Sequence, residues 1–271
     1  MDPYTVGFAR MGLAGGILFG YALFRYPPWS EAFARHWGAV RGLLPSVFLG
    51  AVLFALHLLL WRSAFAYIGL GSSALLLVAQ PAMAVVVGSF YGERFRPLMG
   101  VSLALAAVAL FLVAAGDLEL GPQAWIGDGM CLLAALCTTV FIPATRVARR
   151  MLPMSLFLGS TFLLGSLFLA PFLYFAEAPF GSYGWEEWRW LWGIVLVSTI
   201  GGHGLTNLAA RRFTLFRLNV VVLLQPLLVL AIGVSLFGLH ATLTQVLAAL
   251  LLLVAVAVGL WGTRAAPLVP T

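Results

Sequence analysis

Nine long apolar segments, almost free of charged residues, dominate this chain of 271 residues. A helix that crosses the roughly 30 Å hydrocarbon core of a bilayer needs about 20 apolar residues in a row. The predicted spans are, approximately, 4–24, 43–62, 70–91, 98–116, 126–145, 154–175, 190–210, 218–238 and 242–262. Because backbone polar groups inside lipid must be satisfied within their own segment, we predict that all nine are helices. The predicted fold class is therefore an all-α polytopic membrane protein with nine transmembrane helices in one membrane domain.

Charge composition excludes the main alternatives. Only 9% of the residues are charged, against roughly 25% in a soluble domain, and a disordered chain would need low hydrophobicity and high charge. All 15 basic residues are arginines, in short clusters between apolar segments, which is typical of a membrane protein and not of a nucleic-acid groove. Cys131 and Cys137 lie within one apolar segment. We expect no disulfide framework, no metal site, no cofactor and no nucleic-acid partner.

Arginine positions predict the orientation of the spans. One set of loops contains twelve arginines: Arg25, Arg35, Arg41, Arg94, Arg96, Arg146, Arg149, Arg150, Arg211, Arg212, Arg217 and Arg264. The loops of the other side contain Arg62 and Arg189. Since cytoplasmic loops carry the excess of positive charge, we expect the N-terminus outside and the C-terminus in the cytoplasm. The expected location is a bacterial cell (inner) membrane.

Two segments 145 residues apart resemble each other and indicate an internal repeat. The third span ends the run Leu76-Leu77-Val78-Ala79 with Gln80-Pro81, and the eighth ends Val221-Val222-Leu223-Leu224 with Gln225-Pro226. At the same offset Gly88 falls on Gly233. The third and eighth spans run in opposite directions across the bilayer, so the copies have inverted topology, which is typical of transporters.

The number of spans does not divide equally between two repeats. We expect a first repeat over 1–116 with four helices and a second over 117–271 with five. Met1-Asp2-Pro3 begins at what would be the loop between a first and a second helix. We therefore expect either a late start or a truncation of the chain.

The order of these short motifs resembles the drug/metabolite transporter superfamily, specifically its EamA-like branch. The residues that carry the resemblance are Ala64-Phe65-Ala66-Tyr67, Ala74-Leu75-Leu76, Gln80-Pro81, Gly92-Glu93, Gly100, Ala209-Ala210, Gln225-Pro226 and the last apolar helix near Trp261. The resemblance implies ten helices in two inverted five-helix repeats, with both termini cytoplasmic, and export or exchange of small metabolites such as amino acids. This sequence departs from the pattern in lacking the first helix. It also has Gly238 where the second repeat would carry the acid that corresponds to Glu93.

Polar side chains within the spans are the candidate substrate-binding residues, because such groups are costly in lipid unless they face a cavity or a partner. His57 and His203 lie at depths that a twofold axis in the membrane plane would exchange, and Asn207 is one turn from His203. Gln80 and Gln225 lie near the midplane. We predict a central pocket that hydrogen-bonds a small polar substrate. The alternative is hydrogen bonding between helices, worth about 0.6 kcal/mol on average.

Arg10, two prolines and a glycine stripe complete the candidates. Arg10 stands about two turns into the first span, where it can attract an anionic substrate such as a carboxylate or snorkel toward the outer headgroups. Pro81 and Pro226 each remove a backbone hydrogen bond, so we expect a helix kink or hinge at both. Glycines at every fourth position from 12 to 20 allow close helix packing, either for the missing helix or for a homodimer.

The predicted function is secondary transport of small metabolites, namely amino acids or related polar or amphipathic solutes, by export through alternating access. The expected partners are a small-molecule substrate and the lipid bilayer. No Asp or Glu lies near the middle of a span, so proton coupling would need His57 or His203 as the relay, whereas facilitated movement needs no relay. The alternative is a non-transporting membrane receptor or assembly subunit. We do not expect an enzyme, which would need paired carboxylates, a nucleophile with its base, or metal ligands.

Overall fold

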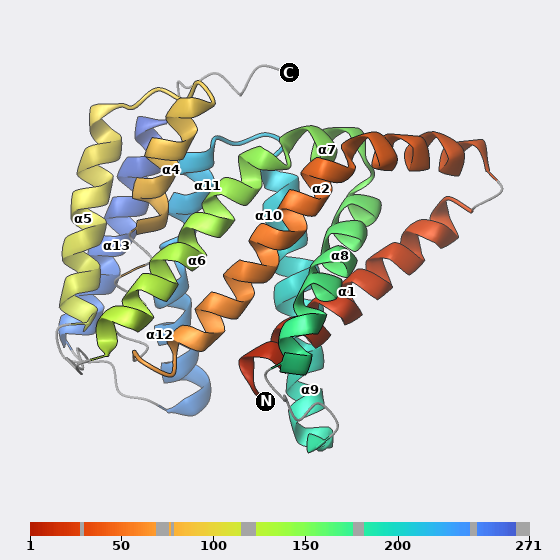
Figure 1. Ribbon diagram of the computed structural model, residues 1–271. Coiled ribbons are helices and arrows are strands. Elements are labelled where there is room, and N and C mark those ends of the chain that lie inside the picture. Colours follow the sequence, from red (N-terminus) through yellow and green to blue (C-terminus); the bar gives the residue numbers. More distant parts are fainter. Residues whose placement is uncertain are drawn as a thin grey trace. The chain divides into compact units, whose positions relative to one another are not determined.

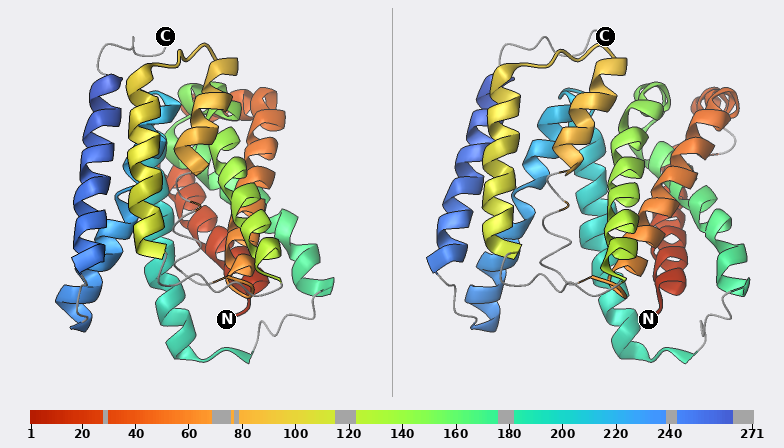
Figure 2. Two further views of the ribbon diagram at one scale, coloured as in Figure 1. Left: turned by 90° about the vertical axis from the view of Figure 1, so that its left-hand side faces the viewer. Right: turned by 60° about the vertical axis from the view of Figure 1, so that its left-hand side comes forward.

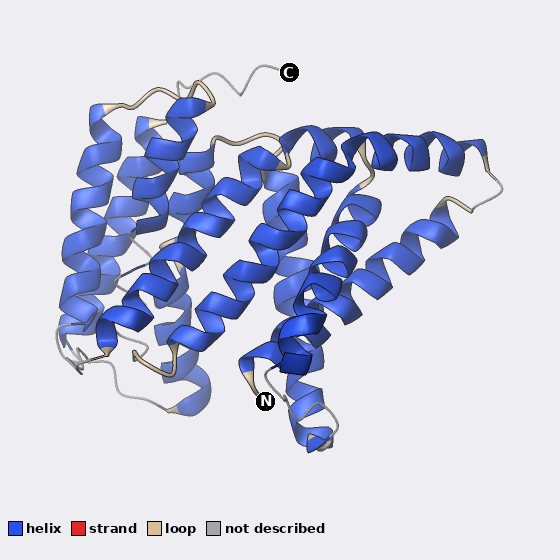
Figure 3. Ribbon diagram, viewed as in Figure 1, coloured by secondary structure: helices blue, strands red, loops and turns tan. Residues whose placement is uncertain are grey.

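The structure is a computed structural model that describes residues 1–27, 30–68, 76, 79–114, 123–175, 182–238 and 243–263. The regular elements in these ranges are helices (Figures 1 and 3), which confirms the all-helical fold class. In chain order they are α1 (Pro3–Arg25), α2 (Glu31–Ala64), α4 (Ala79–Phe90), α5 (Pro97–Ala114), α6 (Ala124–Ala144), α7 (Arg146–Met151), α8 (Met154–Phe175), α9 (Trp185–Gly193), η2 (Ile194–His203), α10 (Gly204–Ala209), α11 (Leu215–Val222), α12 (Gln225–Phe237) and α13 (Leu243–Gly262). Most of the beginning of the predicted third span, with Ala74-Leu75, and Arg264 lie outside the described residues.

Five helices of the described part are long and apolar enough to cross a membrane: Pro3–Arg25, Arg41–Ala64, Ala124–Ala144, Met154–Tyr174 and Gln245–Gly262. Ala79–Phe90 and Pro97–Leu112 are shorter apolar helices. The predicted span 190–210 coincides with the continuous helical segment of α9, η2 and α10, and 218–238 coincides with α11 and α12. The number of nine crossings stays a prediction.

Large apolar side chains point outward from these helices. Phe24 and Phe90 are 83% and 82% exposed, and Val197 in the middle of η2 is 76% exposed. Water would penalise a surface of this kind, whereas lipid tails would not. The outward-facing side chains therefore agree with a membrane environment.

The chain forms two compact units, and each takes segments from both ends of the sequence. The first unit contains Met1–Arg62 and Val140–Arg211, and the second contains Ser63–Thr139 and Arg212–Thr271. The predicted repeats over 1–116 and 117–271 were defined by sequence similarity, whereas the two units are defined by contacts within the structure, so the two divisions of the chain differ. They remain a prediction.

In the first unit, α1 packs against α8 along an antiparallel seam (Figure 1). Gly7 of α1 faces Leu169, Gly15 faces Leu163, and Gly159 of α8 faces Phe19. As the residue number increases along α1, the number of the contacting residue in α8 decreases, so the two helices are antiparallel. A Cβ at Gly15 would lie 2.7 Å from the backbone nitrogen of Leu163. Glycine is needed there because the two backbones approach this closely.

The predicted glycine stripe contributes to this seam at one end only. A Cβ at Gly12 would lie 3.0 Å from the Ser166 hydroxyl oxygen, whereas a Cβ at Gly16 or Gly20 would meet no described atom within 4 Å. Helix rotation explains the difference: Gly16 and Gly20 lie on a face of α1 turned away from α8. A homodimer contact through that face stays a prediction.

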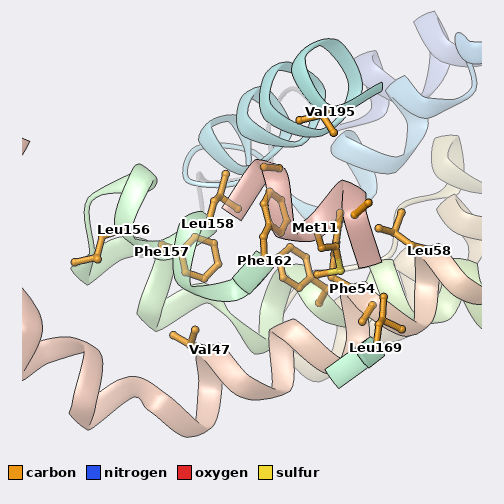
Figure 4. Close-up of a cluster of buried hydrophobic side chains, with 14 of the residues drawn as sticks. Met11, Val47, Phe54, Leu58, Leu156, Phe157, Leu158, Phe162, Leu169 and Val195 are labelled. Atoms are coloured by element: carbon orange, nitrogen blue, oxygen red, sulfur yellow. The ribbon is translucent and has the colours of Figure 1, made fainter. Parts of the chain in front are cut away.

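A cluster of buried aromatic and aliphatic side chains holds the first unit together (Figure 4). Met11 of α1, Phe54 of α2 and Phe162 of α8 are at most 1% exposed. The rings of Phe54 and Phe162 lie 5.0 Å apart, within the range in which aromatic pairs attract each other beyond simple burial. This core fixes α1, α2 and α8 beside one another.

Asp2 ties the beginning of α1 to the chain segment before α9. Its Oδ1 accepts hydrogen bonds from the backbone nitrogens of Tyr4 and Thr5, both at 2.9 Å. Its Oδ2 accepts one from the Tyr183 hydroxyl at 2.8 Å. Burial alone would raise the pKa of Asp2, but these hydrogen bonds outweigh it and lower the pKa below its ordinary value of 3.8.

This lowered pKa predicts a loss of stability in acid. The stabilisation by the Asp2 carboxylate is fully present above pH about 4 and is lost as the pH falls through the lower folded value. Asp2→Ala is expected to cost about 1 kcal/mol of unfolding free energy near neutral pH, and the difference from the wild type should shrink in acid. Thermal melting of both proteins between neutral pH and pH about 2 measures this. A difference that is independent of pH would contradict the role of the carboxylate.

In the second unit, α5 and α13 also pack side by side and antiparallel (Figure 2). Gly262 faces Leu98, and Gly259 faces Ser102, whose hydroxyl donates to the Ala255 carbonyl at 2.7 Å. As along the first seam, small residues permit the close approach.

Glu93 connects α4 to α11 in the same unit. Gly92, with a φ of 83°, turns the chain after α4 in a conformation that favours glycine. Glu93 then accepts a hydrogen bond from the backbone nitrogen of Leu215 at 2.6 Å. The carboxylate thus caps the first turn of α11, where a negative charge is favourable.

Candidate functional site

Arg10 is the centre of a polar cluster in the first unit. Its Nε donates to the Thr199 hydroxyl at 2.6 Å, and its Nη2 donates to the Ser198 hydroxyl at 3.0 Å. The same Nη2 lies 3.4 Å from His203 Nε2. Since guanidinium only donates, Nε2 is the acceptor of this contact, which leaves the proton of a neutral imidazole on Nδ1. Arg10 therefore joins α1 to η2 and does not extend freely along the helix surface.

The helix that receives Arg10 is a π-helix over Ile194–His203. The Thr199 hydroxyl donates to the Ile194 carbonyl five residues earlier, at 3.1 Å. π-helical turns hold an extra residue, are rare, and occur frequently at functional sites. The wider turn presents Ser198, Thr199 and His203 to the same guanidinium.

An aromatic row on α2 continues the cluster beyond His203. The Phe54 ring meets the His203 ring edge-on, with centroids 4.7 Å apart. The His57 ring lies 6.0 Å from that of Phe54, and the Trp61 ring lies 6.2 Å from that of His57. Positions 54, 57 and 61 share one face of a helix. Thus the two predicted histidines are in one cluster, with Phe54 between them.

Within the described part of the chain, no carboxylate forms an ion pair with Arg10. The hydrogen-bond partners of Arg10 there are uncharged groups. A charge held away from water is unfavourable unless it is paired. The cluster can therefore receive an anion, and a carboxylate matches the fork of guanidinium donors.

Asn207 stands next to this cluster but is bound largely within its own helix. Its side-chain nitrogen donates to the His203 carbonyl at 2.8 Å. The side-chain oxygen is buried and has no hydrogen-bond partner in the described residues. This oxygen is a free acceptor, so Asn207 keeps the capacity to bind a donor group.

Gln80 and Gln225 belong to the second unit, as do Pro81 and Pro226. Gln80 is buried in α4, and Gln225 is exposed at the beginning of α12. The structure thus places the six predicted substrate-binding residues in two groups: Arg10, His57, His203 and Asn207 in the first unit, and the two glutamines in the second.

Pro81 lies in α4, directly after residues that the structure does not describe, and Pro226 stands in the first turn of α12. A proline is tolerated there because the first backbone nitrogens have no partner within the helix. α11 ends at Val222, and a turn at Leu223-Leu224 separates it from α12. The roles of Pro81 and Pro226 as a kink or hinge stay predictions.

Ser198, Thr199 and Phe54 were not among the predicted site residues. A hydroxyl pair four and five residues before His203, followed by Gly201-Gly202 within an apolar segment, is the signal that could have identified the first two. Phe54 carries no such signal, because a phenylalanine in an apolar helix is ordinary core or lipid-facing material.

Comparison with known proteins identifies the family. The EamA-like transporter family matches residues 125–261, which is more than half of the chain. A solved crystal structure of another protein aligns with 97% of this chain and 89% of that chain, with a TM-score of 0.76; at 18% identity the likeness concerns the fold alone. No curated protein matches the chain. The family is one of membrane transporters and not of enzymes, and the resemblance stated from the sequence is confirmed: this integral membrane protein belongs to the EamA-like transporter family.

Proposed function

We propose that the chain exports small metabolites that carry a carboxylate, amino acids or related amphipathic solutes, by alternating access. The observation that carries this proposal is the position of Arg10, a cation within α1 whose described partners are two hydroxyls and an imidazole. A bound carboxylate supplies the negative charge that the cluster does not have. The carboxylate of a substrate leaves the cluster when the substrate is released. A carboxylate of the protein itself would stay paired with Arg10 and would prevent substrate binding.

The aromatic row supports an amphipathic solute. A carboxylate on Arg10 would lie beside His203, and Phe54 packs against that imidazole. The partly exposed Trp61 ring then offers apolar surface to the rest of the solute, and a ring face also attracts an ammonium group. We retain Asn207, Gln80 and Gln225 as proposed substrate contacts, and Pro81 and Pro226 as proposed hinges.

The two helix seams support an inverted repeat. The predicted repeat pairs the third span with the eighth, and in the same order it pairs α1 with α8 and α5 with α13. Each of these two pairs is antiparallel and in contact within its own unit. A twofold axis in the membrane plane requires that equivalent helices run in opposite directions, and such repeats allow alternating access around a central site.

We also propose that the N-terminus is outside and the C-terminus in the cytoplasm of a bacterial inner membrane. The support is the excess of twelve arginines over two in the predicted loops.

Transport by the purified protein in proteoliposomes tests the proposal. Vesicles loaded with an unlabelled amino acid should accumulate the labelled one from outside, with saturable kinetics, and the corresponding amino acid amide should be a poorer substrate because it lacks the carboxylate. Vesicles without protein are the control. If no carboxylate solute shows saturable flux, the protein is not a carrier of this class, and the receptor or assembly-subunit alternative is favoured.

The Thr199 hydroxyl provides a finer test of the same site. Thr199→Val keeps the branched shape and removes the hydroxyl that receives Arg10 Nε. A lost hydrogen bond of about 1 kcal/mol predicts a roughly fivefold higher KM. Thr206→Val is the matched control, since that exposed hydroxyl donates to the Gly202 carbonyl of its own helix. An equal KM in both variants would contradict the positioning role of Thr199.

A further inference from the structure

A second arginine cluster of the first unit lies at the connection between two helices that are long enough to cross the membrane. α7 (Arg146–Met151) joins α6, which ends at Ala144, to α8, which begins at Met154. A short connection between two spans lies at the edge of the hydrocarbon layer, where lipid phosphates are found. α7 contains three arginines, and Arg211 from the turn after α10 contacts its last turn.

Arg149 is held inside this connection. It is 2% exposed, and its Nη1 donates to the Ile142 carbonyl at 2.9 Å and to the Thr145 hydroxyl at 3.2 Å. Its Nε is shielded from solvent and has no hydrogen-bond partner among the residues that the structure describes. A buried donor without an acceptor is unfavourable.

Arg211 also donates hydrogen bonds to backbone carbonyls of this connection. Its Nη2 donates to the carbonyls of Arg149 at 2.7 Å and Leu152 at 3.2 Å. Its Nε is likewise buried and has no hydrogen-bond partner in the described ranges of the chain. Arg211 itself is partly exposed, so the cluster is open to the surroundings on this side.

The cluster has an excess of positive charge. Burial lowers the pKa of Arg149 to about 10, and the positive charges of Arg211, Arg150 and Arg146 act in the same direction. Arg149 is therefore still protonated at neutral pH. In the described part of the chain no carboxylate forms an ion pair with Arg149 or Arg211.

We propose that Arg149 and Arg211 form a binding site for a phosphate group, carried by an anionic lipid headgroup or by free phosphate. A phosphate provides what the two side chains do not have, namely oxygen acceptors for the Nε–H groups and a negative charge to compensate the guanidinium groups. Water would supply acceptors but no charge. Basic sites between membrane helices bind anionic headgroups in the same way.

Lipid binding to the purified full chain tests this site. The protein is stripped of lipid in a neutral detergent and titrated with phosphatidylglycerol, and bound lipid is counted by native mass spectrometry. Phosphatidylcholine, which carries a phosphate but is zwitterionic and has no net charge, is the comparison. Arg149→Lys and Arg211→Lys keep the positive charge but lose the Nε–H, and we expect each to weaken phosphatidylglycerol binding about tenfold. Arg212→Lys is the matched control, because Arg212 is the exposed neighbour in sequence and is not among the charges that act on Arg149.

A second arm separates the two sources of phosphate. Inorganic phosphate is added against chloride at equal ionic strength. If it displaces phosphatidylglycerol from the wild type but not from Arg211→Lys, the site takes free phosphate; if it does not displace the lipid, the headgroup is the ligand. The proposal is overturned if phosphatidylglycerol binds no better than phosphatidylcholine and phosphate does not bind, or if the lysine variants bind as Arg212→Lys does. Should Arg149→Lys fail to fold, the partly exposed Arg211 decides the question.

Discussion

Arg10→Gln is expected to reduce carboxylate transport at least tenfold and to leave the protein no less stable. A charge-assisted hydrogen bond contributes about 1.5–3 kcal/mol, which corresponds to roughly 10- to 100-fold in affinity. The stability should not fall, because the substitution removes a charge that no carboxylate of the described residues compensates. Thr199 keeps its hydrogen bond to the Ile194 carbonyl in the variant. Counterflow in proteoliposomes and thermal melting measure the two quantities on the same preparation.

Two further variants separate charge from geometry. Arg10→Lys keeps the charge but loses the fork of donors, and we expect it to retain a part of the activity. Arg62→Gln removes an exposed arginine from the end of α2 in the same unit, and transport should not change. The role of Arg10 in binding the substrate carboxylate is contradicted if Arg10→Gln transports a carboxylate solute with an unaltered KM. It is also contradicted if the wild type does not distinguish the acid from its amide. Arg10 would then serve only to hold α1 against η2.

The fold class follows from the sequence because one physical constraint dominates it. An apolar segment of about 20 residues in lipid has few options other than a helix, so the long helices fall where they were expected. The helix that begins at Gln225 also has Pro226 in its first turn, where a proline is compatible with a helix. The packing of α1 on α8 through Gly15 and Gly159 was not foreseeable, because the rotation of each helix about its axis depends on neighbours far away in the sequence.

The site could be predicted only in part for the same reason. His57 and His203 stand out as polar residues in apolar segments, and both lie in the cluster. The sequence is the same whether the Arg10 side chain snorkels toward the headgroups or points into the protein. The contacts of Arg10 with Thr199 and Ser198 show that it points into the protein. The π-helix changes the register of η2 by local hydrogen bonding that a periodicity of 3.6 residues does not reveal.

Gly15→Ala should destabilise the protein, whereas the same substitution one residue later should not. A Cβ at position 15 would lie 2.7 Å from the Leu163 nitrogen and 3.1 Å from the Phe162 carbonyl carbon. These are backbone atoms of α8, so the whole helix has to move, and overpacking of this kind costs about 1–3 kcal/mol. At Gly16 no described atom lies within 4 Å, and alanine gains up to about 1 kcal/mol of helix propensity. Thermal melting in detergent compares the two variants, and equal melting temperatures would contradict the seam.

Combining Gly15→Ala with Gly159→Ala tests whether α1 and α8 move apart as rigid helices when either glycine is replaced. A Cβ at Gly159 would lie 2.7 Å from the Phe19 nitrogen, about one helical turn along α1 from position 15. One separation of the two helices makes room for both methyl groups, so the double variant should lose less stability than the sum of the single losses. The same movement carries Arg10 away from η2, so carboxylate affinity should fall in each seam variant and stay unchanged in Gly16→Ala. Additive losses would instead mean that each clash is relieved locally, and in that case the position of Arg10 would not depend on the seam.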